Sequence, residues 1–188
     1  MAKNSVHGVL VTMFLGVEMF LVINLILALR AHRGNKSRAE KQVVFVYTLW
    51  VILWSSNLTL FFAKGGLNEW SRVDSAIAVA LCLGIFGLWV FAHIKKLSSS
   101  DGIMRGCLSL LFKVTPQIGQ AIKIAIVGGA PGIGIIMIVV GHMTILTRMA
   151  QLFVAARRGW SRELRGLVLS EMGNEVSWLA VTILWTVL

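Results

Sequence analysis

Long apolar runs separated by short polar segments recur six times along the chain. Each run is close to the roughly 20 residues that a helix needs to cross a hydrocarbon layer about 30 Å thick. None alternates apolar and polar positions as a barrel strand does, and an open sheet cannot satisfy its edges in lipid. We therefore predict an all-α polytopic transmembrane helix bundle in a single domain. Its expected spans are residues 8–29, 42–63, 74–93, 108–127, 132–154 and 167–188.

Composition supports a membrane location. Of the 188 residues, 57% are hydrophobic and 14% are charged, and the mean hydropathy is +0.81, which is too apolar for an ordinary soluble core. The first run is longer than the roughly 7 to 15 apolar residues of a signal peptide and carries Glu18 at its centre, so we predict a retained span. The chain is expected to be an integral protein of the cell (inner) membrane.

Positive charge is concentrated at alternate connections. Of the 18 Lys and Arg residues, thirteen lie at or beside the first, third and fifth connections, and three lie on the opposite side. Because positively charged loops stay in the cytoplasm, both termini are predicted to be non-cytoplasmic. The formal charge is +10. We expect the basic cytoplasmic loops to set the orientation of the chain and to bind anionic lipid headgroups, and we do not expect them to bind nucleic acid.

The fourth run contains a polar stripe. At about 100° per residue, Lys113, Pro116, Gln117, Gln120 and Lys123 share an arc of roughly 120°. Unpaired amides and ammonium groups in lipid cost several kcal/mol, so the stripe is expected to face helices or water. A proline inside the helix frees one backbone carbonyl and usually kinks the axis. Two interpretations remain open: the stripe lines a polar path, or the lysines snorkel to the span ends while the glutamines bond across helices.

Two further titratable residues lie deep in their runs. Glu18 is too short to snorkel and is expected to be paired, protonated or wetted. His142 lies at a comparable depth, which suggests a proton relay between the two, although a lone histidine on an apolar helix more often bonds a neighbouring helix. Glu171 and Glu175 are one helical turn apart and are expected to meet arginines of the preceding connection. The segment WSSNLT, residues 54–59, is expected to serve helix packing.

The segment TPQIGQAIK, residues 115–123, resembles the proline-glutamine signature of PQ-loop and SWEET-like sugar carriers. In that family such a kinked helix begins a three-helix bundle. The resemblance is confined to this segment, because the first half of the chain has no matching dipeptide. The connection between the two halves would also make them inverted rather than parallel, so this segment does not assign the chain to the family.

Function is predicted only at the level of class. No enzymatic motif, metal spacing or cofactor fingerprint is found, and Cys82 and Cys107 lie at different expected depths, so neither a disulfide nor a metal site is predicted. We therefore expect no enzyme and no cofactor. The first hypothesis is a small channel or carrier for protons, ions or a small solute, with the stripe, Glu18 and His142 along its path. The alternative is a non-transporting structural or scaffold subunit of a larger membrane assembly. A homo-oligomer and association with other membrane subunits are both compatible with the sequence.

Overall fold

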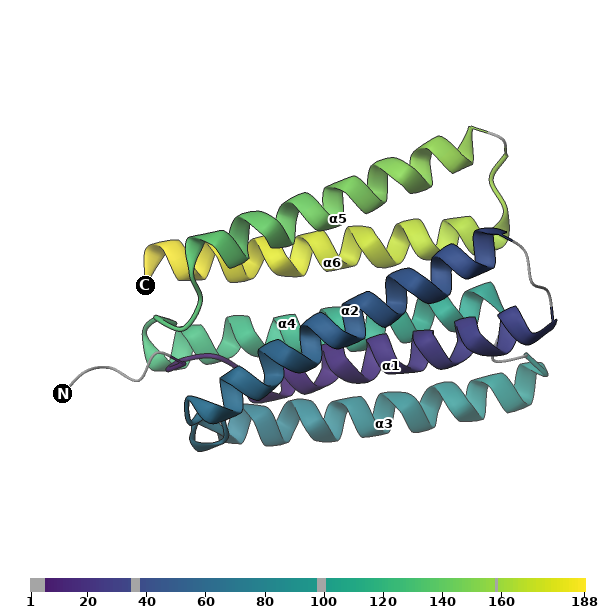
Figure 1. Ribbon diagram of the computed structural model, residues 1–188. Coiled ribbons are helices and arrows are strands. Elements are labelled where there is room, and N and C mark those ends of the chain that lie inside the picture. The colour runs from purple at the N-terminus through teal and green to yellow at the C-terminus, as the bar shows by residue number, and fades with distance from the viewer. Residues whose placement is uncertain (1–5, 35–37, 98–100, 158) are drawn as a thin grey trace.

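Six long helices make up the structure, a computed structural model that describes residues 6–34, 38–97, 101–157 and 159–188 (Figure 1). They are α1 (Val11–Gly34), α2 (Arg38–Ala63), α3 (Arg72–Lys95), α4 (Gly102–Val127), α5 (Ile135–Ala156) and α6 (Arg162–Val187), with a short 3₁₀ helix, η1 (Gly66–Glu69), after α2. All six are long and apolar enough to cross a membrane, and no strand occurs within the described ranges. The predicted fold class is thus confirmed. Lys3, Lys36 and Arg158, which the charge count included, lie outside the described residues.

Polar caps extend several helices beyond the apolar runs that predicted them. Ser71 and Asp74 form a capping box that starts α3, and Asp101 accepts a hydrogen bond from the Ile103 N–H at 2.8 Å to start α4. Ser161 caps α6 in the same way. Because these side chains satisfy the free N–H groups of a first turn, the helices begin in polar sequence that hydropathy alone does not assign to a span.

Three helices form the interior and three form the outside. In α1, α4 and α6, 39% of the apolar stretch is buried, against 6–11% in α2, α3 and α5. Helix α4 lies between α1 and α6, whereas α2 packs on α1, α3 on both α1 and α4, and α5 on α6. Large apolar side chains of the outer helices, such as Phe86 and Val139, are exposed, as expected where the surrounding solvent is lipid.

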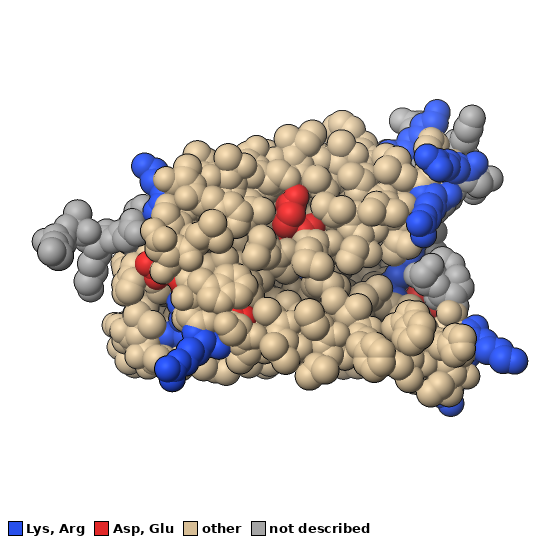
Figure 2. All heavy atoms as spheres, turned by 90° about the horizontal axis from the view of Figure 1, so that it is seen from below, with Lys and Arg blue, Asp and Glu red and all other residues tan. Residues whose placement is uncertain are grey.

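Both ends of the described chain lie at the same end of the bundle, which we call the terminal end (Figure 1). The α2–α3 and α4–α5 connections lie there as well, and helices α1, α3 and α5 end at the opposite end of the bundle. Figure 2 shows Lys and Arg gathered at the two ends of the molecule. The length between them is free of Lys and Arg on this face, and acidic atoms emerge near its middle. This distribution suits a bundle whose middle is surrounded by hydrocarbon.

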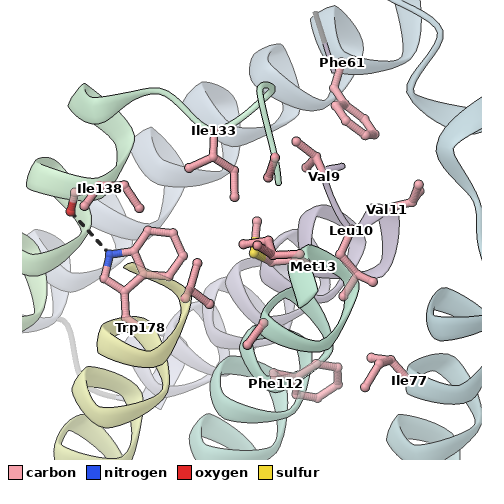
Figure 3. Close-up of a cluster of buried hydrophobic side chains, with 14 of the residues drawn as sticks. Val9, Leu10, Val11, Met13, Phe61, Ile77, Phe112, Ile133, Ile138 and Trp178 are labelled. Carbon is pink, nitrogen blue, oxygen red and sulfur yellow. Dashed lines mark hydrogen bonds between the residues drawn. The ribbon is translucent and has the colours of Figure 1, made fainter. Parts of the chain in front are cut away.

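Small residues allow the inner helices to approach one another. A Cβ on Gly106 of α4 would lie 3.3 Å from the backbone of Gly166 in α6. A Cβ on Gly119 would lie 2.4 Å from Ile77 and 2.9 Å from Leu10. Ile77 and Leu10 belong to the apolar cluster that fills the terminal half of the bundle (Figure 3). Close backbone approach through small residues is the usual means of packing membrane helices, because lipid supplies no hydrophobic force between them.

Candidate functional site in the membrane interior

The stripe of α4 faces other helices, in two separate groups. Near the terminal end, Gln120 and Lys123 contact the segment that leads into α1. Further along, Lys113 and Gln117 contact α6. Beside Gln117, the buried ring of Pro116 packs against α1, where a Cβ on Gly16 would lie 3.2 Å from the proline Cγ. Helix α4 continues unbroken through the proline.

Gln120 and Lys123 bind the backbone that precedes α1. Gln120 is fully buried; its Oε1 accepts from the Leu10 N–H at 2.6 Å, and its Nε2 donates to the Gly8 carbonyl at 2.8 Å. The Lys123 ammonium donates to the Val9 carbonyl at 2.8 Å, to the Glu69 carbonyl at 2.5 Å and to Asp74 Oδ2 at 3.2 Å. These acceptors use all three N–H bonds of the ammonium group.

Asp74 caps two helices at once. Its Oδ1 accepts from the Thr12 N–H at 3.0 Å and the Thr12 hydroxyl at 3.3 Å, at the start of α1. Its Oδ2 accepts from the Ser71 N–H at 3.0 Å and the Ser71 hydroxyl at 2.7 Å, at the start of α3. Asp74 is 0% exposed. We call Asp74, Gln120 and Lys123 the terminal cluster; each member is buried, and its polar atoms are bonded.

A second network joins α4 to α5 and α6. Lys113 donates to Glu171 Oε1 at 2.5 Å, and Arg148 Nε lies 3.1 Å from the same oxygen. Asn174 donates to the other oxygen of Glu171 at 3.2 Å and accepts from Gln117 Nε2 at 2.8 Å. Glu171 therefore does meet an arginine, but Arg148 belongs to α5 rather than to the connection that follows it. This network pairs the half-buried Lys113 with the buried Glu171 within the bundle.

Glu18 has one bonded oxygen and one that lacks a partner. The Ser55 hydroxyl of α2 donates to Oε1 at 2.6 Å, whereas Oε2 is buried without a hydrogen bond among the described residues. Glu18 follows the first residue of α1, Val11, by seven positions, which places it about 10 Å along the helix. At that depth a carboxyl oxygen without a partner is costly, because the surrounding hydrocarbon supplies no hydrogen bonds.

His142 bridges α5 and α6 through both ring nitrogens. Nδ1 lies 2.7 Å from Glu175 Oε1, and Nε2 lies 2.9 Å from the Thr182 hydroxyl. Thr182 donates its own proton to the Trp178 carbonyl at 3.0 Å, so towards the ring it acts as an acceptor. The second oxygen of Glu175 is buried and has no partner in the described part of the chain.

The His142–Glu175 pair joins a hydroxyl group to a carboxyl group through one imidazole ring. Nε2 faces an oxygen that donates elsewhere, and Nδ1 lies within hydrogen-bond distance of the carboxyl group. Its side chains are 21% and 23% exposed, compared with 0% for the Asp74 side chain.

The sequence-predicted residues are brought together only in part. Glu18 bonds α2, and His142 bonds α6. Helices α1 and α5 do not contact each other in the described structure, since α4 and α6 lie between them. Direct contact between Glu18 and His142 is therefore absent among these residues. Sequence reasoning did not include Glu175 or Asp74 among the candidate site residues. The spacing of Ser71 and Asp74, typical of a capping box, was the available signal for Asp74.

Comparison with protein families, with curated proteins and with solved structures found no match. The described residues also contain no group of three or more His, Cys, Asp or Glu side chains that could hold a metal ion. The site in this six-helix bundle thus consists of the bonded terminal cluster and of two carboxyl groups, Glu18 and Glu175. Each of these carboxyl groups has one oxygen without a partner among the described residues.

Proposed function

We propose that the protein is a small proton-coupled membrane carrier, with the His142–Glu175 pair between α5 and α6 as its protonation site. One observation carries the proposal. Both ring nitrogens of His142 are engaged, while Glu175 Oε2 is buried and unpaired among the described residues. Such a pair binds a proton in hydrocarbon without net charge, and it becomes an uncompensated anion when the proton leaves.

The proton would act on a single helix interface. Among the described helices, the close backbone packing of α5 is against α6, and its Arg148 side chain also reaches Tyr47 of α2. Trp178 of α6 faces Gly141 of α5, and its Nε1 donates to the Ile138 carbonyl at 3.3 Å (Figure 3). A deprotonated pair would draw water, which favours separation of α5 from α6, whereas the neutral pair favours the closed contact. Alternation between these states exposes the site to one side of the membrane and then to the other.

We propose that the path lies at the α5–α6 interface rather than along the α4 stripe. The amide of Gln120 and the ammonium of Lys123 already have protein partners. A group in a transport path must exchange its partners with the solute, whereas a bonded group in a close-packed interior stabilises one structure. We assign the stripe to helix attachment and the unpaired carboxyl of Glu175 to transport.

A second candidate function, a structural subunit of a larger membrane assembly, is favoured by the terminal cluster and the Lys113–Glu171 ion pair. Buried bonded groups of this kind hold helices in register without transporting anything. In that case the His142–Glu175 pair is a further contact that holds α5 against α6, and its protonation has no consequence for flux across the membrane.

Proton uptake into proteoliposomes discriminates between the two functions. Vesicles containing the native chain and a pH-sensitive dye are challenged with an inward proton gradient and a panel of sugars, amino acids and inorganic cations. The native chain is expected to show solute-stimulated proton movement, and Glu175→Gln is expected to lower it at least about tenfold, because the amide cannot release the proton. Thr144→Val is the matched control, since the Thr144 hydroxyl bonds only its own helix.

Two outcomes would contradict the carrier. Either the native chain moves no protons with any solute of the panel, or Glu175→Gln moves them as fast as the native chain. Both would transfer the assignment to the structural subunit.

A further inference from the structure

Helix α2 presents an unpartnered face to the membrane. It is the least buried of the six spans, with 6% of its apolar stretch buried. Along one side of the helix lie Val46, Trp50, Leu53, Asn57 and Leu60, all of them exposed. The exposed fractions of the four apolar side chains range from 41% to 61%. We call these five residues the α2 face.

The spacing of the α2 face is that of a coiled-coil seam. Successive members are separated by four, three, four and three residues, which is the alternation of d and a positions in a heptad repeat. Leu53 and Leu60 then occupy d positions, and Trp50 and Asn57 occupy a positions. A 3.5-residue period keeps such a stripe against a partner helix that crosses at about 20°, the commonest geometry in membrane bundles.

Asn57 is the polar member of this face. Its side chain is exposed, and it makes no hydrogen bond with any described residue. The neighbouring hydroxyls differ, because Ser56 donates to the Ile52 carbonyl and Thr59 to the Ser55 carbonyl, each at 2.8 Å. Asn57 is six residues from the end of α2 at Ala63, or about 9 Å along the helix. An unpaired amide at that depth favours any partner that supplies a donor and an acceptor.

We infer that the α2 face binds the α2 face of a second copy of this chain, in a parallel dimer with the two Asn57 side chains paired. The amide carries both a donor and an acceptor, so it is complementary to itself. Two copies inserted in the same orientation are related by rotation about the membrane normal, which brings equivalent residues together at equal depth. A single asparagine at an a position fixes the register of such a pair.

Cysteine cross-linking in the membrane tests the surface. In a chain lacking its two free cysteines, Cys82 and Cys107, Leu53→Cys is compared with Ile52→Cys. Both positions are exposed, at 48% and 58%, but they lie about 100° apart around the helix. Because d residues of a parallel pair face each other within disulfide reach, oxidation is expected to yield a covalent dimer with Leu53→Cys and none with Ile52→Cys. Equal yields at the two positions would overturn the α2 face as the interface.

Dilution of the protein into increasing amounts of lipid tests the role of Asn57, with energy transfer between labelled copies as the measure of association. Asn57→Leu is expected to weaken association about three- to thirtyfold, the range known for hydrogen bonds between membrane helices. Thr59→Val removes an exposed hydroxyl that bonds only its own helix and should leave association unchanged. A monomeric native chain, or an Asn57→Leu chain that associates as strongly as the native one, would overturn the proposed pairing. This inference does not depend on proton transport.

Discussion

Two acid–base pairs in this bundle have similar composition and different surroundings. In the terminal cluster, Asp74 lies 3.2 Å from Lys123, and the further hydrogen bonds to the carboxylate come from Thr12 and Ser71. In the second pair, Glu175 lies 2.7 Å from His142, and one of its oxygens has no partner in the described structure. The first carboxylate accepts hydrogen bonds at both oxygens, whereas the second has one bonded oxygen and one without a bond among the described residues.

The difference follows from where each acid lies along the helices. Asp74 is at the start of α3 and beside the start of α1, where backbone N–H groups have no partner within their own helix and the helix dipole favours an anion. Glu175 is in the middle of α6, where every backbone N–H is already used by the helix. Only side chains can bond it there, and His142 supplies a single donor. A fully bonded acid stabilises the fold, and the incompletely bonded one is the proposed site of proton exchange.

Removing the carboxylate of the terminal cluster should have the largest effect. Asp74→Ala leaves the Lys123 ammonium buried beside no anion and leaves the N–H groups of two helix starts unpaired. We expect a loss of about 3–5 kcal/mol in the free energy of unfolding, measured by detergent titration of the purified protein. Asp101→Ala is the matched control, because Asp101 caps only α4; its expected loss is about 1 kcal/mol. Similar losses in the two variants would contradict the role assigned to the terminal cluster.

Replacing the buried amide of the same cluster should have the next largest effect. Gln120→Leu leaves the Leu10 N–H and the Gly8 carbonyl without partners in an apolar interior. The expected loss is about 2–3 kcal/mol, measured in the same titration. Gln117→Leu serves as the comparison, because its partners Asn174 and Ser177 retain other hydrogen bonds, and it should lose less than Gln120→Leu. A larger loss in Gln117→Leu would show that the Gln120 bonds to the segment before α1 contribute less than the Gln117 bonds to α6.

The contact between α5 and α6 can be altered without touching a titratable group. A Cβ on Gly141 would lie 2.3 Å from Trp178 Nε1, so Gly141→Ala forces the indole away from α5. We expect a loss of about 1–3 kcal/mol in unfolding free energy, together with slower proton movement because the interface is displaced. Gly87→Ala is the control, since its Cβ would meet nothing within 4 Å; it should leave transport unchanged and raise stability by up to about 1 kcal/mol. Native stability and transport in Gly141→Ala would contradict this account of the interface.

The fold was more predictable from sequence than the site. Apolar run length indicated all six helices, and periodicity placed Lys113, Gln117, Gln120 and Lys123 on one face of α4. Their partners lie far away along the chain: Asp74 is 49 residues from Lys123, and Glu171 is 58 residues from Lys113. Local periodicity records which face of a helix is polar, but not which other helix meets it. Helix packing order determines that, and here it gives Glu18 and His142 separate partners.

The same chemical substitution in both pairs should affect them differently. Asp74→Asn turns an amide N–H₂ group towards N–H and O–H donors and leaves Lys123 uncompensated, so a loss of several kcal/mol is expected. Glu175→Gln retains a hydrogen bond to His142, because its amide N–H₂ group donates to Nδ1 of a neutral imidazole. Its carbonyl oxygen then takes the position of the carboxyl oxygen that has no bond in the described structure. The expected loss of unfolding free energy is below about 1 kcal/mol, whereas proton transport should fall at least about tenfold. Detergent titration and proteoliposome flux on the same preparations separate the effect on stability from the effect on transport. Equal destabilisation by both variants would mean that Glu175 is as firmly bonded as Asp74. A small stability change together with a loss of flux in Glu175→Gln would instead support Glu175 as a protonation site. The fold would then tolerate its unpaired oxygen, and transport would require its proton.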